Sequence, residues 1–373
     1  MATPSKKKVD VLFLVIVLSI TAGGFLLFLS AAMGYLTQSS AQFTNVVITQ
    51  GVALVLGLVA LYVFSHIHYR FWRKHAFTFL FVAVMATLLV FIPGLGIEHG
   101  GAVRWLSAGP FTIQPSEILK VVFIIYCAAW LSGITTKLDK VTYGLLPLTL
   151  LIGIVALVLL SQPDTNTLIV IATASTAMFF VAGARWRDIG AIVGLGIVGF
   201  LLLIWRRPYI YDRVITLINP SAADGLGSGY QIQQSLIAIG SGDWLGRGFG
   251  QSVQKFHFLP EAPSDSIFAV AAEELGFIGA LVIVTAFLLL IWRGFYIAMR
   301  APDVFSRLLV VGIVIMVATQ AITHIGGMIG ILPVSGAPLL FVSLGGTALI
   351  MTLASMGIVL NISRYSHTKP KKT

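Results

Sequence analysis

Long apolar runs, separated by short polar stretches, fill most of the 373-residue chain. A helix needs about 20 apolar residues to cross the hydrocarbon core of a bilayer. The runs that approach this length cover 11–33, 44–65, 76–93, 116–132, 143–161, 166–184, 189–205, 266–292, 307–327 and 339–361. The pattern therefore predicts an all-α polytopic membrane protein with about ten transmembrane helices.

The composition agrees with this pattern. Hydrophobic residues make up 57% of the chain and charged residues only 10%, whereas a soluble domain carries about 25% charged residues. Most of the surface must therefore lie in lipid, and one membrane domain is expected rather than several soluble ones. The single cysteine, Cys127, lies inside an apolar run, so no intramolecular disulfide can form and a packing role is expected.

The N-terminus resembles a signal peptide, because Lys6, Lys7 and Lys8 precede the first apolar run. That run continues to about Met33, which is long enough to span, and no small-residue cleavage site precedes a soluble domain. We therefore expect a cytoplasmic tail at 1–10, a membrane domain at 11–362 and a basic cytoplasmic tail at 363–373.

The basic residues orient the predicted spans. With the N-terminus in the cytoplasm and the spans alternating, only seven of the 24 Lys and Arg residues fall outside: Arg104, Lys120, Arg206, Arg207, Arg213, Arg247 and Lys255. Cytoplasmic segments of membrane proteins are enriched in Lys and Arg, which supports this layout with both termini inside. The net charge of +10 is then a signal of orientation and not a nucleic-acid surface.

Two polar stretches on the predicted outer side are candidates for function. The larger, 206–264, lies between the seventh and eighth spans and is rich in Gly, Ser, Gln and aromatic residues; the other is 94–115. Long loops in compact domains are usually functional. Within the larger stretch, 231–239 is either a short amphipathic helix lying on the membrane or part of a flexible loop.

Glu117 and Lys120 are two charged residues of opposite sign on the predicted outer side. They are three residues apart at the start of the fourth span, where Pro115 suits the first turn of a helix. This spacing places them on one helical face, so they can pair. Two interpretations stay open: an ion pair that fixes the entry of the helix, or part of a polar site.

Several motifs resemble the SEDS family (shape, elongation, division and sporulation), specifically its FtsW-like members, with RodA as a close relative. They are GAVRW and GPFTIQPSEILK within 101–120, GYQIQQSLIAIGSG at 229–242, the stretch 260–276, LLPVSG and FVSLGG before the last span, and NISR at 361–364. The chain departs from the family pattern at Pro263, where a histidine is usual, after Asp164, where Gly-Thr is usual, and at Leu340 and Leu344, which replace a proline and a tyrosine.

The resemblance implies a peptidoglycan glycosyltransferase that polymerises lipid II on the outer face of the bacterial cytoplasmic membrane. Asp265 matches the family's essential aspartate, and we expect it to be the base; a helix cap is the alternative for an aspartate at this position. The residues expected to bind substrate are Arg104, Glu117, Lys120, Arg213, Gln234, Ser235, Arg247, Lys255, Glu261 and Glu273. Glu273 and Glu274 would lie about 12 Å deeper along the eighth span, as functional acids or as structural hydrogen-bonding groups.

The resemblance also implies partners: lipid II, a class B penicillin-binding protein, and other divisome or elongasome membrane proteins. No metal-ligand spacing is visible, although a divalent cation, Mg or Mn, stays open as a cofactor. A RodA-like elongation polymerase, a lipid II flippase and a non-catalytic scaffold are the alternative functions. A flippase would need a polar path across the whole membrane, whereas the polar residues cluster at the outer side. The Gly-Ile-Glu at 96–98 and the Gly-Pro-Phe turn at 109–111 favour FtsW over RodA.

Overall fold

Helices dominate the computed structural model, which describes residues 8–37, 39–99, 102–109, 111–218, 227–256, 258–334 and 336–366. Lys6, Lys7, residues 219–226 of the long loop and the end of the basic tail lie outside the described residues. The proposed limits of the tails at 10 and 363 therefore stay predictions.

Each of the ten predicted spans contains a helix. The bounds are α1 Val11–Ala32, α2 Ser40–His66, α3 Arg70–Leu88, α4 Pro115–Gly133, α5 Leu145–Ser161, α6 Thr165–Val181, α7 Trp186–Arg206, α10 Ile267–Met299, α11 Val304–Met328 and α12 Gly346–Ser363. Among the described residues, 8 helices are long and apolar enough to cross a membrane, while α5 and α6 are shorter. The all-α membrane fold is confirmed, and the count of ten spans stays a prediction.

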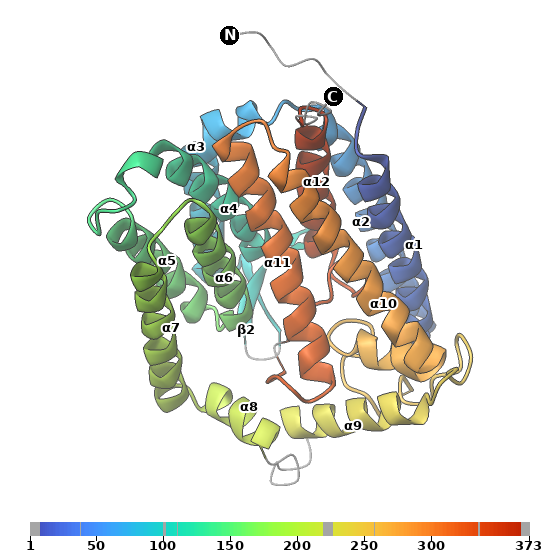
Figure 1. The fold of residues 1–373 in the computed structure, drawn as a ribbon. Helices are drawn as coiled ribbons and strands as arrows, with labels where there is room; N and C mark the ends of the chain where they lie inside the picture. Colours follow the sequence, from blue (N-terminus) through green and yellow to red (C-terminus); the bar gives the residue numbers. More distant parts are fainter. Residues whose placement is uncertain are drawn as a thin grey trace.

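Helix α1 begins and helix α12 ends at the same end of the helix bundle, which we call the terminal end (Figure 1). There the Asp10 N–H donates to Ser363 Oγ at 3.0 Å, and the Asp10 carboxylate pairs with Arg293 at 2.8 Å. At the opposite end, here the loop end, α8 (Pro208–Ile218) and α9 (Ser228–Ser241) run across the bundle (Figure 1). Of the two interpretations of 231–239, the helix is correct and is longer than expected, while its position on the membrane stays a prediction.

A three-stranded antiparallel sheet forms at the loop end, within the stretch 94–115. Its strands are β1 Gly96–His99, β2 Ala102–Ala108 and β3 Phe111–Ile113, in that order. The apolar pattern did not predict this sheet, because strands of three to seven residues contain too few alternations to register. Strand β3 ends at Ile113 and α4 begins at Pro115, so the sheet fixes where the chain enters α4.

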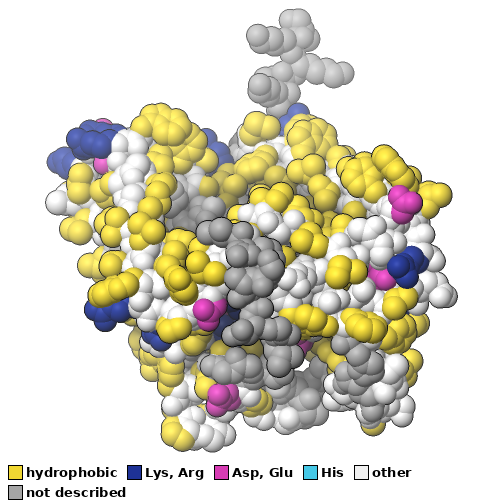
Figure 2. Space-filling model, turned by 90° about the horizontal axis from the view of Figure 1, so that it is seen from below, with side chains coloured by type: hydrophobic (Ala, Val, Ile, Leu, Met, Phe, Trp, Pro, Cys, Tyr) yellow, Lys and Arg dark blue, Asp and Glu magenta, His cyan; other side chains and the backbone are white. Residues whose placement is uncertain are grey.

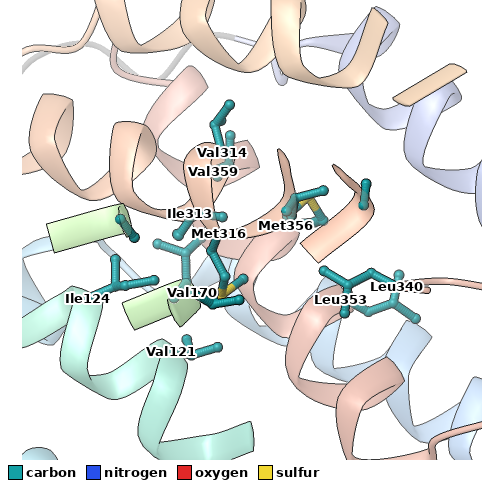
Figure 3. Close-up of a cluster of buried hydrophobic side chains, with 14 of the residues drawn as sticks. Val121, Ile124, Val170, Ile313, Val314, Met316, Leu340, Leu353, Met356 and Val359 are labelled. Carbon is teal, nitrogen blue, oxygen red and sulfur yellow. The ribbon is translucent and has the colours of Figure 1, made fainter. Parts of the chain in front are cut away.

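The core of the protein lies between α4, α6, α11 and α12. Figure 3 shows it as a cluster that includes Ile124 of α4, Val170 of α6, Met316 of α11 and Met356 of α12. The buried share of the most apolar stretch is 72% in α11 and 78% in α12, whereas it is only 11% in α7. The central helices therefore pack against protein, and α7 presents its apolar side chains outward, as a lipid-facing helix does.

Two predicted spans differ from the helices observed. The span predicted at 266–292 is interrupted at Gly276, whose φ of 67° and ψ of −168° are not helical, so α10 consists of two helical pieces that meet at a kink. The span predicted at 339–361 begins too early, since α12 starts at Gly346. The residues before it are irregular: Pro338 has no N–H to donate, and Phe341 has a φ of 68°.

The close approach of α2 to α12 makes a testable prediction. A β-carbon on Gly357 would lie 2.6 Å from the Leu61 carbonyl oxygen, so the two helices can touch only with glycine there. We expect Gly357→Ala to lower the free energy of unfolding by about 1–3 kcal/mol, because overpacking forces the backbone apart. Thermal unfolding of the detergent-purified protein measures this loss.

Gly51→Ala, on the facing helix α2, is the matched control, because a β-carbon there meets nothing within 4 Å. It should leave stability unchanged or raise it by up to about 1 kcal/mol, as alanine favours helix over glycine. Equal melting temperatures for the two variants would contradict the close α2–α12 packing.

Candidate functional site

Asp265 lies on a tight turn immediately before α10. The carbonyl oxygen of Glu261 accepts the backbone N–H groups of Ser264, Asp265 and Ser266 at 3.1, 3.0 and 3.2 Å. The N-cap of α10 is Ser266 and not Asp265, so the helix-cap interpretation of Asp265 is wrong. Ser266 also donates its hydroxyl to the Pro260 carbonyl at 2.8 Å, which fixes both ends of the turn.

Arg213 of α8 lies near Asp265, and both side chains approach Gly336. A β-carbon on Gly336 would be 3.5 Å from Asp265 Oδ2 and 3.5 Å from Arg213 Nη2, so these two atoms are no more than about 7 Å apart. Gly336 has a φ of +62°, a conformation that favours glycine, and its lack of a side chain keeps this space open. The structure therefore brings together two of the predicted site residues from segments 52 positions apart in the sequence.

Arg104 of β2 adds a second positive charge to this site. Its Nε donates to the Gln162 carbonyl at 3.0 Å, and its Nη2 donates to the Pro163 carbonyl. Burial lowers the pKa of Arg213, and the charge of Arg104 lowers it further, while Tyr209 and Asp265 act in the opposite direction. One carboxylate and two guanidinium groups thus gather at the loop end, in a place suited to an anionic group.

Glu117 and Lys120 form the expected ion pair, with Lys120 Nζ 2.7 Å from Glu117 Oε2. Both side chains are buried, and Lys120 also donates to Gln320 Oε1 at 2.8 Å. Gln320 in turn donates to the Pro338 carbonyl at 3.1 Å. These contacts favour the interpretation as a structural pair, which ties α4 to α11 and supports the irregular segment before α12.

Lys255 is also committed to a buried ion pair. Its ammonium group donates to Glu274 Oε1 and to the Gly250 carbonyl at 2.8 Å each, and to Ser30 Oγ at 3.1 Å. Both charged side chains are fully buried. The expectation that Lys255 is a cation open to diphosphate is therefore wrong, because its three donors already have partners.

Glu273 holds the loop that follows α9. It accepts the hydroxyl of Ser252 at 2.5 Å and the backbone N–H groups of Val253 and Gln254 at 3.0 and 3.3 Å. Arg247 lies 3.6 Å from the same carboxylate, with its side chain 43% exposed. Glu273 is therefore fully engaged within the protein, and its expected role in substrate binding has no support from its contacts.

Glu274 lies beside the end of α1, while the separation of Glu273 and Glu274 from Asp265 along the helix stays a prediction. Glu274 accepts the hydroxyl of Ser30, which is two residues before the end of α1 at the loop end, at 2.6 and 2.7 Å. The kink at Gly276 follows both acids, so they lie at the end of the first, buried piece of α10. The two acids belong to the loop end and have structural roles.

The remaining predicted site residues lie on the loop-end helices and the turn. Gln234 is half-buried on α9, and Ser235 is buried and contacts Met328 Sδ at 3.4 Å. Glu261 is exposed and accepts the Ser264 hydroxyl at 2.9 Å. Figure 2, which views the loop end, shows few charged side chains scattered among hydrophobic and uncharged ones.

The sequence interpretation missed the residues that support this site from inside the bundle. Gln50, Gln320 and His324 are polar residues within apolar helices, and each contacts the backbone between Ala337 and Gly345. A polar residue inside an apolar span is itself a signal, because its burial costs free energy unless it finds a partner. The partner could not be read from the sequence.

No three His, Cys, Asp or Glu side chains among the described residues come together in a way that could hold a metal ion. Since Mg²⁺ is usually bound through one or two carboxylates together with substrate phosphates, a cation beside Asp265 would need oxygen ligands from the substrate.

The fold and the site define a multi-pass helical membrane protein with an acid and two arginines at one end of the bundle. Residues 10–368 match the FtsW, RodA and SpoVE family, described as cell cycle proteins. Stage V sporulation protein E of Bacillus subtilis is 39% identical over 311 residues, which are 83% of this chain and 85% of that protein. The probable peptidoglycan glycosyltransferase FtsW of Geobacter metallireducens is 36% identical over 357 residues, 96% and 95% of the two chains.

Solved structures agree with this assignment. A chain from a peptidoglycan synthase complex, described as coordinating polymerization and crosslinking, has a TM-score of 0.78 at 28% identity over 95% of this chain and 98% of that chain. The rod shape determining protein RodA of Thermus thermophilus has a TM-score of 0.71 at 26% identity over 97% and 98% of the two chains. The protein therefore belongs to the FtsW/RodA/SpoVE family.

The Lys255–Glu274 pair gives a stability prediction. Lys255→Met leaves the Glu274 carboxylate buried without its cation, and such a loss typically costs about 3–5 kcal/mol. Adding Glu274→Gln to Lys255→Met removes the unpaired charge and should recover part of this loss. Thermal unfolding of both variants, together with limited proteolysis of the loop 246–259, measures the effect.

Arg247→Met is the control, since its exposed guanidinium should contribute at most about 1 kcal/mol. A Lys255→Met protein as stable as this control would contradict the buried pair.

Proposed function

We propose that the protein is a peptidoglycan glycosyltransferase that polymerises lipid II, with Asp265 as the base. The observation that carries this proposal is the position of the Asp265 carboxylate beside Arg213, with Arg104 nearby. Sugar transfer from a lipid diphosphate needs a group that takes the proton of the attacking hydroxyl and positive charge that stabilises the leaving diphosphate. The site offers both, from three separate segments of the chain.

In this reaction the 4-hydroxyl oxygen of the acceptor sugar bonds to the anomeric carbon of the donor sugar. Its proton moves to the Asp265 carboxylate, and the bond from the anomeric carbon to the diphosphate oxygen breaks. The lipid diphosphate leaves with the electron pair, next to Arg213 and Arg104. The arginines stabilise charge where it develops, which lowers the barrier more than uniform binding of the substrate does. A divalent cation bound by the diphosphate would also stabilise the negative charge of the leaving group.

The loop end would face the outside of the cytoplasmic membrane. The bias of Lys and Arg toward the predicted cytoplasmic segments supports this orientation, and both termini would then be cytoplasmic. The partner would be a class B penicillin-binding protein, together with other divisome or elongasome membrane proteins. The similarity to a chain of a synthase complex that polymerises and crosslinks supports such a partner.

A role in cell division is proposed first, on the FtsW-like motifs and the FtsW-named relatives. A RodA-like role in elongation is the alternative, and septal or lateral localisation of a fluorescent fusion separates the two. Neither a flippase nor a scaffold gains support from the contacts. A flippase needs a polar path between the two ends of the bundle, whereas the centre of α4, α6, α11 and α12 is an apolar cluster (Figure 3).

Asp265→Asn tests the base. Removing a general base typically lowers the rate about 10²–10⁴-fold, so glycan chains should no longer form from lipid II at a measurable rate. The assay uses the purified full-length protein with its penicillin-binding partner and follows chain length on gels.

Asp243→Asn is the matched control, because Asp243 is exposed at the same end and has a φ of 48°, which asparagine tolerates well. It should polymerise at the wild-type rate. Chains of normal length from the Asp265→Asn protein would rule out Asp265 as the base, and an inactive wild type would rule out the enzyme.

Arg213→Gln tests the anion site. Loss of one guanidinium beside the diphosphate should lower the polymerisation rate about tenfold or more, since a charge-assisted hydrogen bond in a partly buried site is lost. Arg206→Gln is the control, because Arg206 is exposed and stacks on Trp205. Wild-type rates for both variants would show that Arg213 does not contact the leaving group.

A further inference from the structure

A cavity of about 470 Å³ opens at the loop end, beside the turn that carries Asp265. Its walls come from the end of α1 and the 3₁₀ turn Met33–Thr37, the first turn of α2, the loop segment 259–263 and Leu344. Its volume falls within the range of about 300–1,000 Å³ that is usual for small-molecule sites. Neither Asp265 nor the two arginines line it.

The cavity and the proposed base share one rigid turn. Glu261 lines the cavity, and its carbonyl accepts the Asp265 N–H at 3.0 Å. Pro263, in the same wall, accepts the Leu344 N–H at 2.7 Å, which attaches the turn to the buried segment before α12. A ligand in the cavity would therefore contact the turn that carries Asp265, whereas Asp265 and Gly336 are not among the lining residues.

The charge inside this cavity is opposite to that of the arginine site. Lys255 lines the wall, but its ammonium is fully buried against Glu274, Ser30 and the Gly250 carbonyl. Among the described lining residues, the charge presented to a ligand is then that of the exposed Glu261 carboxylate. A diphosphate would be repelled here, whereas hydroxyl and amide N–H donors would be attracted.

The other lining groups suit a sugar ring. The Tyr35 hydroxyl and the Gln42 side-chain amide can donate and accept hydrogen bonds. Pro260, Ala262 and Pro263 add apolar surface, against which the C–H face of a pyranose can pack. A pyranose with an acetamido group carries both kinds of surface, polar at its edge and apolar on its face.

We propose that this cavity is a sugar subsite, which holds an N-acetylated pyranose of the glycan next to the reacting one. The diphosphate would lie on the other side of the turn, near Arg213, so the turn 261–265 would separate sugar binding from charge stabilisation. This inference rests on the proposed function, because it assumes that the substrate contains linked N-acetylated sugars.

Cysteine protection tests the subsite directly. The native Cys127 is buried, so a cysteine introduced by Gln42→Cys in the full-length protein is labelled selectively by a maleimide. N,N′-diacetylchitobiose at millimolar concentration should slow this labelling about fivefold or more, whereas inorganic diphosphate should not. Adding Glu261→Gln should remove most of the protection, because the acceptor of the sugar hydroxyls loses its charge.

Ala41→Cys is the matched control, since Ala41 is the exposed neighbour on α2 and does not line the cavity. Its labelling rate should not respond to the sugar. An unchanged rate at Gln42→Cys, equal protection by diphosphate, or undiminished protection with Glu261→Gln would overturn the subsite.

Polymerisation of lipid II by the wild-type protein is measured in parallel. Glycan chains without sugar protection would refute the subsite alone. Sugar protection without glycan chains would refute the proposed function and leave a sugar-binding cavity.

Discussion

The irregular backbone between Gly336 and Gly345 is the constraint on which the loop end depends. Backbone groups at membrane depth must find partners inside the protein, because lipid offers none. Gln50 accepts the Gly345 N–H and donates to the Ser343 carbonyl, Gln320 donates to the Pro338 carbonyl, and His324 Nδ1 lies 2.7 Å from the Ala337 carbonyl. With these groups satisfied, α12 can start late, at Gly346, and the segment before it can enter the bundle.

This segment also positions the proposed chemistry. Gly336, at one end of it, provides the space between Asp265 and Arg213, and Leu344, near the other end, is bonded to Pro263 in the turn before α10. The buried Glu117–Lys120 pair acts on the same segment through Gln320. A charged pair buried in this way contributes little net stability compared with apolar residues, but its geometry fixes which groups meet. The proposed base therefore depends on contacts several residues away from it.

The acids of the loop end differ in role. Glu273 and Glu274, at the end of the first piece of α10, lie at the level where α1 ends and hold the loop after α9. Asp265 is left as the acid that faces the arginines. The sequence alone suggested three acids along one helix, and only their contacts with other parts of the fold separate their roles.

Apolar run length and the placement of Lys and Arg determined the class of protein from the sequence, because lipid selects for continuous apolar helices whatever their neighbours are. The motifs around 101–120, 229–242 and 260–276 pointed to the family, which the comparisons show. Tertiary structure alone decided which charged residues of the loop end meet: Arg213 approaches Asp265 and Arg104 lies near Arg213, while Lys120, Lys255 and Glu273 are held in buried contacts. The physical reason is that the pairing of charges depends on distances across the fold. When two residues lie far apart in the chain, no local sequence pattern predicts that they are in contact.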